Sequence, residues 1–386
     1  MNFVLSEFQL QLEDSVRRFA RKELPAIGKW MEETAEPSPP ELVRQFADMG
    51  WLGMNLPVEY GGQGAQPIDA LIVLEELAKI SPAAAFPVFE SCFGPILAIC
   101  HFGPIALREL LVPKVVAGEH MISVSMSEPQ AGSALTELTT KAVRVDGGWR
   151  LSGQKRWCSG AGHAEGYVVY CRMSEAPGAK GIGAVYVERD TQGFSFGKQE
   201  SLMGFRGIPS ADMYFDDVFV PEHHVVVESG GFTSMMRAFN LERCANATMG
   251  LGVAQGAFDY ALEYVQDRRQ FGKPIIDFQA VQIRIADMAV RLDAARLLIR
   301  RAATSLQDGF PSVRDSSMAK CFSNEVIREI AGNALQIMGA YGYSKEYPIE
   351  QRLRDAWGWG IAGGAIDIQK VNIAAEIVGR RFDQRR

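Results

Sequence analysis

The sequence predicts an α+β protein in which one β domain lies between two helical domains. Apolar residues recur every three to four positions up to about residue 120, alternate with polar residues between about 121 and 228, and then return to helical spacing. Because each spacing is typical of one kind of secondary structure, we expect three domains, covering residues 1–120, 121–228 and 229–386. A chain of 386 residues is long enough for two or three domains.

The composition is typical of an ordinary globular protein, with 47% hydrophobic and 22% charged residues. The net charge of -6 argues against a nucleic-acid-binding protein, which usually has a basic face. The six cysteines form no C-x-x-C pair, so neither a metal site nor a disulfide framework is expected. The N-terminus lacks an apolar signal core, and no run reaches the roughly 18 to 20 apolar residues of a membrane span. We therefore expect a cytoplasmic enzyme.

Helices are expected throughout the N-terminal domain. Apolar residues at helical spacing predict one helix that includes residues 8–19, and further helices are expected over 41–49, 68–80 and 107–119. Glu90 stands in the apolar stretch between the last two of these helices. We interpret it first as a carboxylate at a helix end or on the surface, and second as a functional group.

Strands are expected in the middle domain. Asp146-Gly147-Gly148 joins two alternating runs and predicts a β-hairpin. The other strand candidates end at Gly, Asp or Pro turns. They cover residues 121–126, 166–170, 183–187 and 213–215.

The C-terminal domain is predicted to begin with one long helix, from about Phe232 to Arg269, closed by a turn at residues 271–274. Its first half carries Glu242 and Arg243 in a run that is otherwise mainly Met, Phe, Ala and Gly. An ionised carboxylate on such a helix is costly to bury unless it has a partner or a task, so we expect Glu242 to be functional. Further helices over 280–306, 318–338 and 366–378 would complete an antiparallel bundle.

Four short motifs are candidates for ligand binding. In residues 127–133, S-E-P-Q-A-G-S, small side chains let the backbone pass close to a planar ligand, and backbone N–H groups could bind its oxygens. Residues 153–160, G-Q-K-R-W-C-S-G, place an indole and a hydroxyl beside glycines. The other two motifs are R-R-Q-F-G at 268–272 and Q-I-M-G-A-Y-G at 336–342.

With these motifs in this order, the chain resembles the acyl-CoA dehydrogenase family over its full length. The resemblance implies an N-terminal helical domain, a middle β-barrel or sandwich, and a C-terminal four-helix bundle. It also implies a homotetramer, built as a dimer of dimers, with FAD at the subunit interface. The implied reaction is α,β-dehydrogenation of an acyl-CoA or acyl-carrier-protein thioester to the trans-2-enoyl thioester, as in fatty acid metabolism. The implied electron acceptor is an electron-transfer flavoprotein.

The resemblance also implies roles for individual residues. Those expected to line the isoalloxazine ring are Met126, Ser127, Trp157 and Ser159. Those expected at the pyrophosphate and adenine end of FAD, contributed by the neighbouring subunit, are Arg268, Gln270, Phe271, Gln279, Gln336, Gly339 and Ala340. Those expected to hold the pantetheine and phosphate portions of CoA are Ser133, Asn240 and Arg243. The backbone N–H of Gly363 would help to polarise the thioester carbonyl.

The chain departs from most of the family near its C-terminus. Most members place the catalytic glutamate in an I-Y-E-G-T segment, but residues 361–365 here read I-A-G-G-A, with Gly363 at the glutamate position. In branches such as the isovaleryl-CoA and long-chain dehydrogenases, the base lies on the long helix in an x-E-R sequence, which Leu241-Glu242-Arg243 matches. The resemblance therefore implies that Glu242 is the catalytic base, and Glu90 is the next candidate.

An alternative is a redox-neutral lyase, because the C-terminal segment and residues 203–209 also resemble 3-sulfinopropionyl-CoA desulfinase. In that branch an arginine holds the sulfinate, and the resemblance matches its position to Phe86 of this chain. That branch also lacks an acid at the Glu242 position. A phenyl ring near Glu90 is a poor partner for an anion. We therefore expect a dehydrogenase, and a flavin-binding protein without turnover is a third hypothesis.

Overall fold

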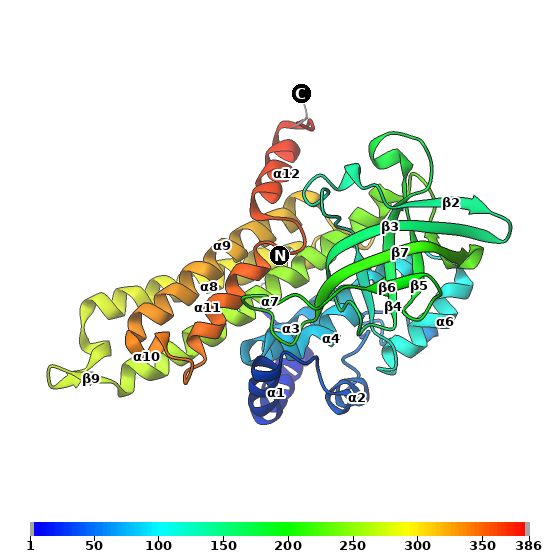
Figure 1. Ribbon diagram of the computed structural model, residues 1–386. Helices are drawn as coiled ribbons and strands as arrows, with labels where there is room; N and C mark the ends of the chain where they lie inside the picture. Colours follow the sequence, from blue (N-terminus) through cyan, green and yellow to red (C-terminus); the bar gives the residue numbers. More distant parts are fainter. Residues whose placement is uncertain (1–3, 383–386) are drawn as a thin grey trace.

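The computed structural model describes residues 4–382, and its elements follow the order α–β–α (Figure 1). The N-terminal helices are α1 (Glu7–Thr34), α2 (Pro40–Asp48), α3 (Pro67–Ile80), α4 (Pro82–Phe93), α5 (Pro95–Phe102) and α6 (Ile105–Val116). Several begin with proline, which costs no hydrogen bond in the first turn. The helices predicted over 8–19, 41–49, 68–80 and 107–119 are confirmed.

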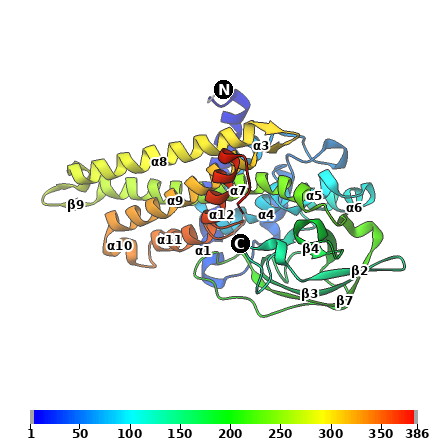
Figure 2. The same ribbon diagram turned by 90° about the horizontal axis from the view of Figure 1, so that it is seen from above.

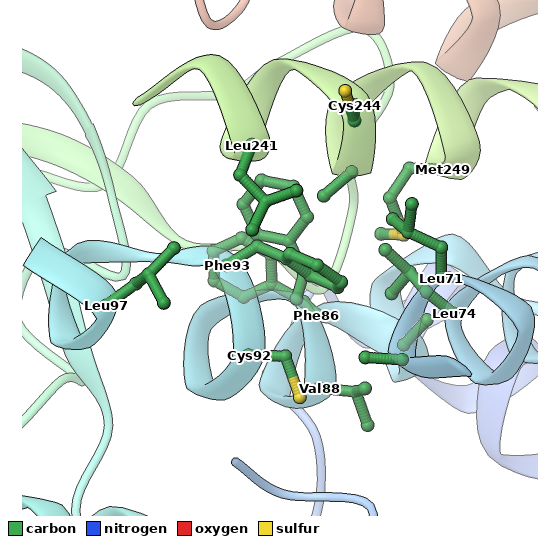
Figure 3. Close-up of a cluster of buried hydrophobic side chains, with 14 of the residues drawn as sticks. Leu71, Leu74, Phe86, Val88, Cys92, Phe93, Leu97, Leu241, Cys244 and Met249 are labelled. Carbon is green, nitrogen blue, oxygen red and sulfur yellow. The ribbon is translucent and has the colours of Figure 1, made fainter. Parts of the chain in front are cut away.

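Helices α4 and α5 form the centre of the core, separated by Gly94. Together they contain the stretch Pro82–Phe102, which is long and apolar enough to cross a membrane, so our expectation that no run reaches that length was wrong. The apolar window in this stretch is 100% buried inside the protein. Figure 3 shows why: Phe86 and Phe93 of α4 face Leu241 on the long helix α7 (Phe232–Asp267).

The middle region is one eight-stranded sheet with strand order β6-β7-β3-β2-β4-β5-β8, and β1 pairs with β4. The predicted hairpin is confirmed, because Val145 pairs with Gly148 across the turn Asp146-Gly147. The strands predicted within 121–126, 166–170, 183–187 and 213–215 are also confirmed. The strands are β1 (Ile122–Ser125), β2 (Lys141–Val145), β3 (Gly148–Ser159), β4 (Gly166–Arg172), β5 (Ile182–Glu188), β6 (Phe194–Phe196), β7 (Ser210–Pro221) and β8 (Val225–Val227).

The C-terminal region is a helical bundle around α7. The predicted long helix ends at Asp267, and the next residues form a hairpin whose turn residues Phe271 and Gly272 have φ of 51° and 82°. Prediction from the sequence missed α11. The remaining elements are β9 (Arg269–Gln270), β10 (Lys273–Pro274), α8 (Gln279–Thr304), β11 (Leu306–Gln307), β12 (Phe310–Pro311), α9 (Val313–Met338), α10 (Ala340–Tyr343), α11 (Ile349–Trp359) and α12 (Ile366–Val378).

Helix α7 joins the sheet to the far tip of the bundle. It has 36 residues, which correspond to about 54 Å at 1.5 Å per residue. Its first turns lie beside the sheet and α4, and the β9 hairpin lies at its other end (Figures 1 and 2). Close approach to α3 depends on glycine, because a Cβ added at Gly252 would lie 2.6 Å from the Cβ of Ala78.

Candidate active site

Glu242 lies on α7 in a partly buried position. Burial raises the pKa of its carboxyl to about 8, although the nearby cations Arg243 and Lys320 act in the opposite direction. Lys320 reaches this region from α9, and Tyr170 lies near Glu242 on β4. A carboxyl whose pKa lies near neutral pH can both accept and release a proton under ordinary conditions.

Glu90 is the second carboxyl group of this region. It lies in the last turn of α4, as one of the two first interpretations had it, but it is only 4% exposed, so the surface interpretation was wrong. Its Oε2 atom has no hydrogen-bond partner in the described part of the chain. Burial, followed by the charge of Glu242, raises the pKa of Glu90 well above its ordinary value. Burial and the neighbouring Glu242 thus both favour the neutral form of Glu90.

Arg243 is held in place by Asn240. The Nη1 atom of Arg243 donates to Oδ1 of Asn240 at 2.5 Å, and the Asn240 amide donates to the carbonyl oxygen of Pro311 at 3.1 Å. The guanidinium also lies over the ring of Phe239, 5.4 Å from its centroid. Its Nε atom is buried without a partner among the described residues. The arginine is thus oriented and still has donors for an anionic group, whereas the Asn240 amide already has protein partners.

The residues expected to line a planar ring meet where the end of β1 lies beside β3. The backbone N–H of Arg156 donates to the carbonyl oxygen of Ser127 at 2.9 Å, which brings Met126 and Ser127 next to Trp157 and Ser159. Trp157 is 53% exposed and has φ of 61°, a conformation that is unusual for a residue with a side chain. The structure thus brings these four residues together and leaves the indole half-exposed, with the guanidinium of Arg156 4.4 Å from its ring centroid. Ser133 lies on an exposed part of the loop that follows.

A buried ion pair that the sequence analysis did not recognise supports this loop. Nζ of Lys155 lies 3.0 Å from Oε1 of Glu128, and both side chains are almost fully buried. Burial alone would raise the pKa of Glu128, but Lys155 and hydrogen bonds from Thr139 and Thr140 hold it at about 2. Lys155 and Glu128 are 27 residues apart in the sequence, so no local pattern indicated the pair.

The loop between α11 and α12 lies on the same side of the molecule as Glu242 and contains Gly363. Its backbone is anchored by Lys320, whose Nζ donates to the carbonyl oxygens of Ala362 at 2.6 Å and Trp359 at 3.1 Å. A Cβ at Gly363 would lie 3.7 Å from that nitrogen, and Gly363 has φ of 66°. Lys320 was also missed, because its surroundings come from segments that are distant in the sequence.

Aromatic rings connect this loop to α4. Phe86 and Phe89 stack with centroids 5.9 Å apart, and Phe89 lies 6.2 Å from Trp359. Phe205, from the loop before β7, lies 4.6 Å from Trp359. These rings give this part of the site an aromatic wall beside the carboxyl of Glu90.

The other expected ligand-binding residues gather at the far tip of the bundle. The guanidinium of Arg268 lies 5.2 Å from the ring centroid of Tyr341, which joins the end of α7 to α10. Phe271 is 93% exposed. The remaining expected residues are also exposed and lie on the same hairpin and adjoining helix ends: Gln270, Gln279, Gln336, Gly339 and Ala340. Within one chain, this tip and the β1–β3 edge lie toward opposite ends of the molecule (Figure 1).

Comparison with known proteins identifies the family. Three family profiles match: the acyl-CoA dehydrogenase N-terminal domain over residues 6–119, the middle domain over 123–218 and the C-terminal domain over 229–378. The fold is similar to that of butyryl-CoA dehydrogenase from Megasphaera elsdenii, with a TM-score of 0.94 and 30% identity over 98% of this chain and 100% of that one. The chain therefore belongs to the acyl-CoA dehydrogenase family.

Related proteins of known name fall into two groups, desulfinases and dehydrogenases. The chain is 39% identical over 391 residues to 3-sulfinopropanoyl-CoA desulfinase of Paraburkholderia xenovorans (strain LB400), covering 100% of this chain and 99% of that protein. It is 33% identical over 376 residues to acyl-CoA dehydrogenase of Bacillus subtilis (strain 168), covering 97% and 99%. Membership in the family thus leaves two reaction types to consider.

The β1–β3 edge fits a flavin. A structural neighbour, PigA, was solved as an FAD complex and matches with a TM-score of 0.92 and 25% identity over 98% of this chain and 99% of that one. In the present chain, the exposed indole of Trp157 and its left-handed backbone are features that proteins usually retain for a ligand. At the tip, a Cβ added at Gly339 would meet nothing within 4 Å, so a ligand could approach the backbone there.

Proposed function

We propose that this protein is an FAD-dependent acyl-CoA dehydrogenase in which Glu242 is the catalytic base. The observation that carries the proposal is the position of Glu242, a carboxyl with a pKa raised to about 8, near the arginine Arg243 and the anchored loop of Gly363. Removal of a proton α to a thioester needs a base of about this strength, together with a polarised carbonyl. Both requirements can be met here by residues that the fold brings to one side of α7.

In this mechanism, Glu242 accepts the α proton of the acyl thioester. The backbone N–H of Gly363 stabilises negative charge on the thioester oxygen, because a fixed donor needs no reorganisation as that charge develops. Arg243 and Ser133 bind the phosphate and pantetheine parts of the substrate, since a guanidinium pairs well with phosphate. Asn240 orients Arg243. Bound FAD supplies the acceptor for the β hydride.

FAD would be held between two copies of the chain. Met126, Ser127, Trp157 and Ser159 would line its ring, and the exposed residues at the tip of a neighbouring copy, such as Arg268 and Phe271, would hold its other end. Support comes from the arrangement in one chain, where these two sets lie at opposite ends of the molecule. We therefore propose a homotetramer built as a dimer of dimers, located in the cytoplasm and passing electrons to an electron-transfer flavoprotein.

A desulfinase-like lyase is the second candidate. The 39% identity with 3-sulfinopropanoyl-CoA desulfinase and the glycine at position 363 favour it. Against it, Phe86 and Phe89 line the aromatic side of the region, and the polar group beside them is the buried carboxyl of Glu90. An anionic sulfinate gains nothing from a phenyl ring, and Glu90 supplies no positive charge to hold it.

The test is an anaerobic titration of the purified holoenzyme with isovaleryl-, long-chain, cyclic, succinyl- and 3-sulfinopropionyl-CoA, followed by visible absorbance. Bleaching by any of them supports the dehydrogenase and names its substrate class. Sulfite release with unchanged colour supports the lyase. The matched control is Glu242→Gln, which should remain yellow and bind ligand without bleaching. Bleaching at the parental rate in that variant would exclude Glu242 as the base.

A further inference from the structure

Lys320 is a buried cation that the proposed mechanism does not use. Its side chain is fully buried in the middle of α9. Nζ donates to Oδ1 of Asn246 at 2.7 Å and to the carbonyl oxygens of Trp359 at 3.1 Å and Ala362 at 2.6 Å. All three acceptors are neutral, and no carboxylate in the described part of the chain lies within ion-pair distance of this nitrogen. A lysine is seldom buried without an ionic partner, so a function is a reasonable explanation.

The partners of Lys320 connect it to the site from two directions. Asn246 lies on α7, one helical turn beyond Glu242, and its amide donates to the carbonyl oxygen of Ala362 at 3.3 Å. Asn324 donates to Oδ1 of Asn246 at 3.1 Å and to the backbone carbonyl of Lys320 at 2.9 Å. The ammonium group, the helix that carries Glu242 and the Gly363 loop therefore form one hydrogen-bonded unit.

We propose that Lys320 is a positioning residue of the active site, which fixes the Gly363 loop through two carbonyl oxygens and supplies a positive charge that favours the carboxylate form of Glu242. The inference rests on the proposed role of Glu242 as the base. A cation near a carboxyl favours loss of its proton, and the interaction is stronger in a buried site than in water.

The charges around both groups agree with this role. Lys320 is faced by Arg243 and Glu242 from α7 and by Arg328 and Cys321 of its own helix. Glu242 is faced by Arg243 and Lys320, by Glu90 from α4 and by Tyr170 from β4. Burial, followed by the charge of Arg243, lowers the pKa of Lys320, and the charge of Glu242 acts in the opposite direction. Lys320 in turn lowers the pKa of Glu242, so the ammonium and the carboxylate favour each other as a coupled pair.

The test compares Lys320→Met with a control that loosens the same loop without removing a charge. Oγ of Ser317 donates to Oε1 of Gln369 at 3.0 Å, and Nε2 of Gln369 donates to the carbonyl oxygen of Gly364 at 3.0 Å. Ser317→Ala therefore weakens a second attachment of the loop and leaves the charge of Lys320 in place. Colour and thermal unfolding show whether each variant is folded and holds FAD.

Two pH profiles provide the measurement. The first is kcat/KM with the acyl-CoA that reduces the enzyme, and the second is enolate formation from bound acetoacetyl-CoA, followed by near-ultraviolet absorbance, which needs no redox step. Lys320→Met should move the acid limb of both profiles to higher pH by about one unit. Ser317→Ala should keep the parental acid limb, whatever its rate. If Lys320→Met does not fold, Lys320→Gln, which retains a donor but no charge, should give the same shift.

If the acid limb of the pH profiles stays in place in Lys320→Met, or moves equally in Ser317→Ala, the proposal is wrong. Lys320 is then a purely structural residue. The acetoacetyl-CoA profile separates this failure from failure of the proposed function. If no acyl-CoA reduces the parent enzyme but the enolate still forms, dehydrogenation is excluded while the effect of Lys320 on the base is still measured. If Glu242→Gln also forms the enolate at the parental pH, Glu242 is not the base, and the inference fails with it.

Discussion

Nζ of Lys155 lies 3.0 Å from Oε1 of Glu128, and this buried ion pair joins β3 to the loop that begins at Ser127. The carboxylate also accepts hydrogen bonds from the backbone N–H groups of Thr139 at 2.6 Å and Thr140 at 2.9 Å. Nζ of Lys155 donates in addition to the carbonyl oxygen of Met126 at 2.8 Å. The position of the expected flavin-binding loop therefore depends on a pair of charges inside the protein.

Removing one member of this pair should be strongly destabilising. Lys155→Met leaves Glu128 buried without its cation, and we expect a loss of roughly 3–5 kcal/mol in the free energy of unfolding. We also expect weaker retention of FAD, because the loop loses the bond to Met126. Denaturant unfolding and the absorbance ratio of flavin to protein measure the two effects. The double variant Lys155→Met/Glu128→Leu should recover part of the stability; a double variant as unstable as the single one would show that charge pairing is not the cause.

Loss of the carboxylate at position 242 should abolish turnover. Glu242→Gln is nearly isosteric, and we expect kcat/KM to fall by about 10²–10⁴-fold, the usual contribution of a general base. In the parent enzyme, kcat/KM should rise with pH until Glu242, with its pKa raised to about 8, is fully ionised. Stopped-flow reduction measured between pH 6 and 9 checks both expectations. A rate that does not depend on pH over this range would contradict the assignment of the base.

The variant Glu90→Gln distinguishes the role of Glu90 from that of Glu242. Burial and the charge of Glu242 raise the pKa of Glu90 well above its ordinary value, which favours the neutral carboxyl, so a neutral amide should change stability little. We expect kcat/KM to remain within about 10-fold of the parent, because the base itself is intact. The measurement is kcat/KM of Glu90→Gln, of Glu242→Gln and of the parent enzyme under the same conditions. A loss as large as that of Glu242→Gln would make Glu90 the base instead.

The order of the domains and most of the elements could be predicted from the sequence, because hydrophobic spacing depends only on local residues. The long helix shows the limit of that approach, since its apolar pattern continues to Val265 but does not specify the hairpin that follows Asp267. Helix α11 was missed because its buried residues pack against elements from several parts of the chain.

The site was less predictable than the fold. Glu242 was found because an acid on an apolar helix is visible in the sequence. Glu90 was interpreted first as a carboxylate at a helix end or on the surface, and its burial was missed because the charge of Glu242 that faces it comes from α7, which is far away in the chain. Lys155 and Lys320 were not assigned any role, because a buried lysine has the same one-dimensional pattern as an exposed one. Such groups become visible only when the partners of each buried charge are known.

Asp355 provides a test of how burial affects stability at the junction of the sheet and the bundle. Its side chain is 2% exposed, and its Oδ1 accepts a hydrogen bond from the backbone N–H of Phe205 at 2.8 Å. Burial raises the pKa of this carboxyl to about 7, although the hydrogen bond from Phe205 lowers it. The folded state therefore binds a proton more tightly than the unfolded state, and the stabilising contribution is lost as pH rises from about 4 to 7.

Asp355→Asn keeps an acceptor for Phe205 and cannot ionise, so it should be more stable than the parent at pH 8, by on the order of 2–4 kcal/mol, and nearly equal to it at pH 4. Glu350→Gln on the same helix is the matched control with the opposite sign. A hydrogen bond from Arg354 lowers the pKa of Glu350, so the parent should be more stable than Glu350→Gln at pH 8, and the difference should shrink as pH falls. Denaturant unfolding of the three proteins at pH 4 and pH 8 measures both differences. If Asp355→Asn is less stable than the parent at pH 8, the ionised carboxylate of Asp355 is stabilising, and burial does not dominate its energetics.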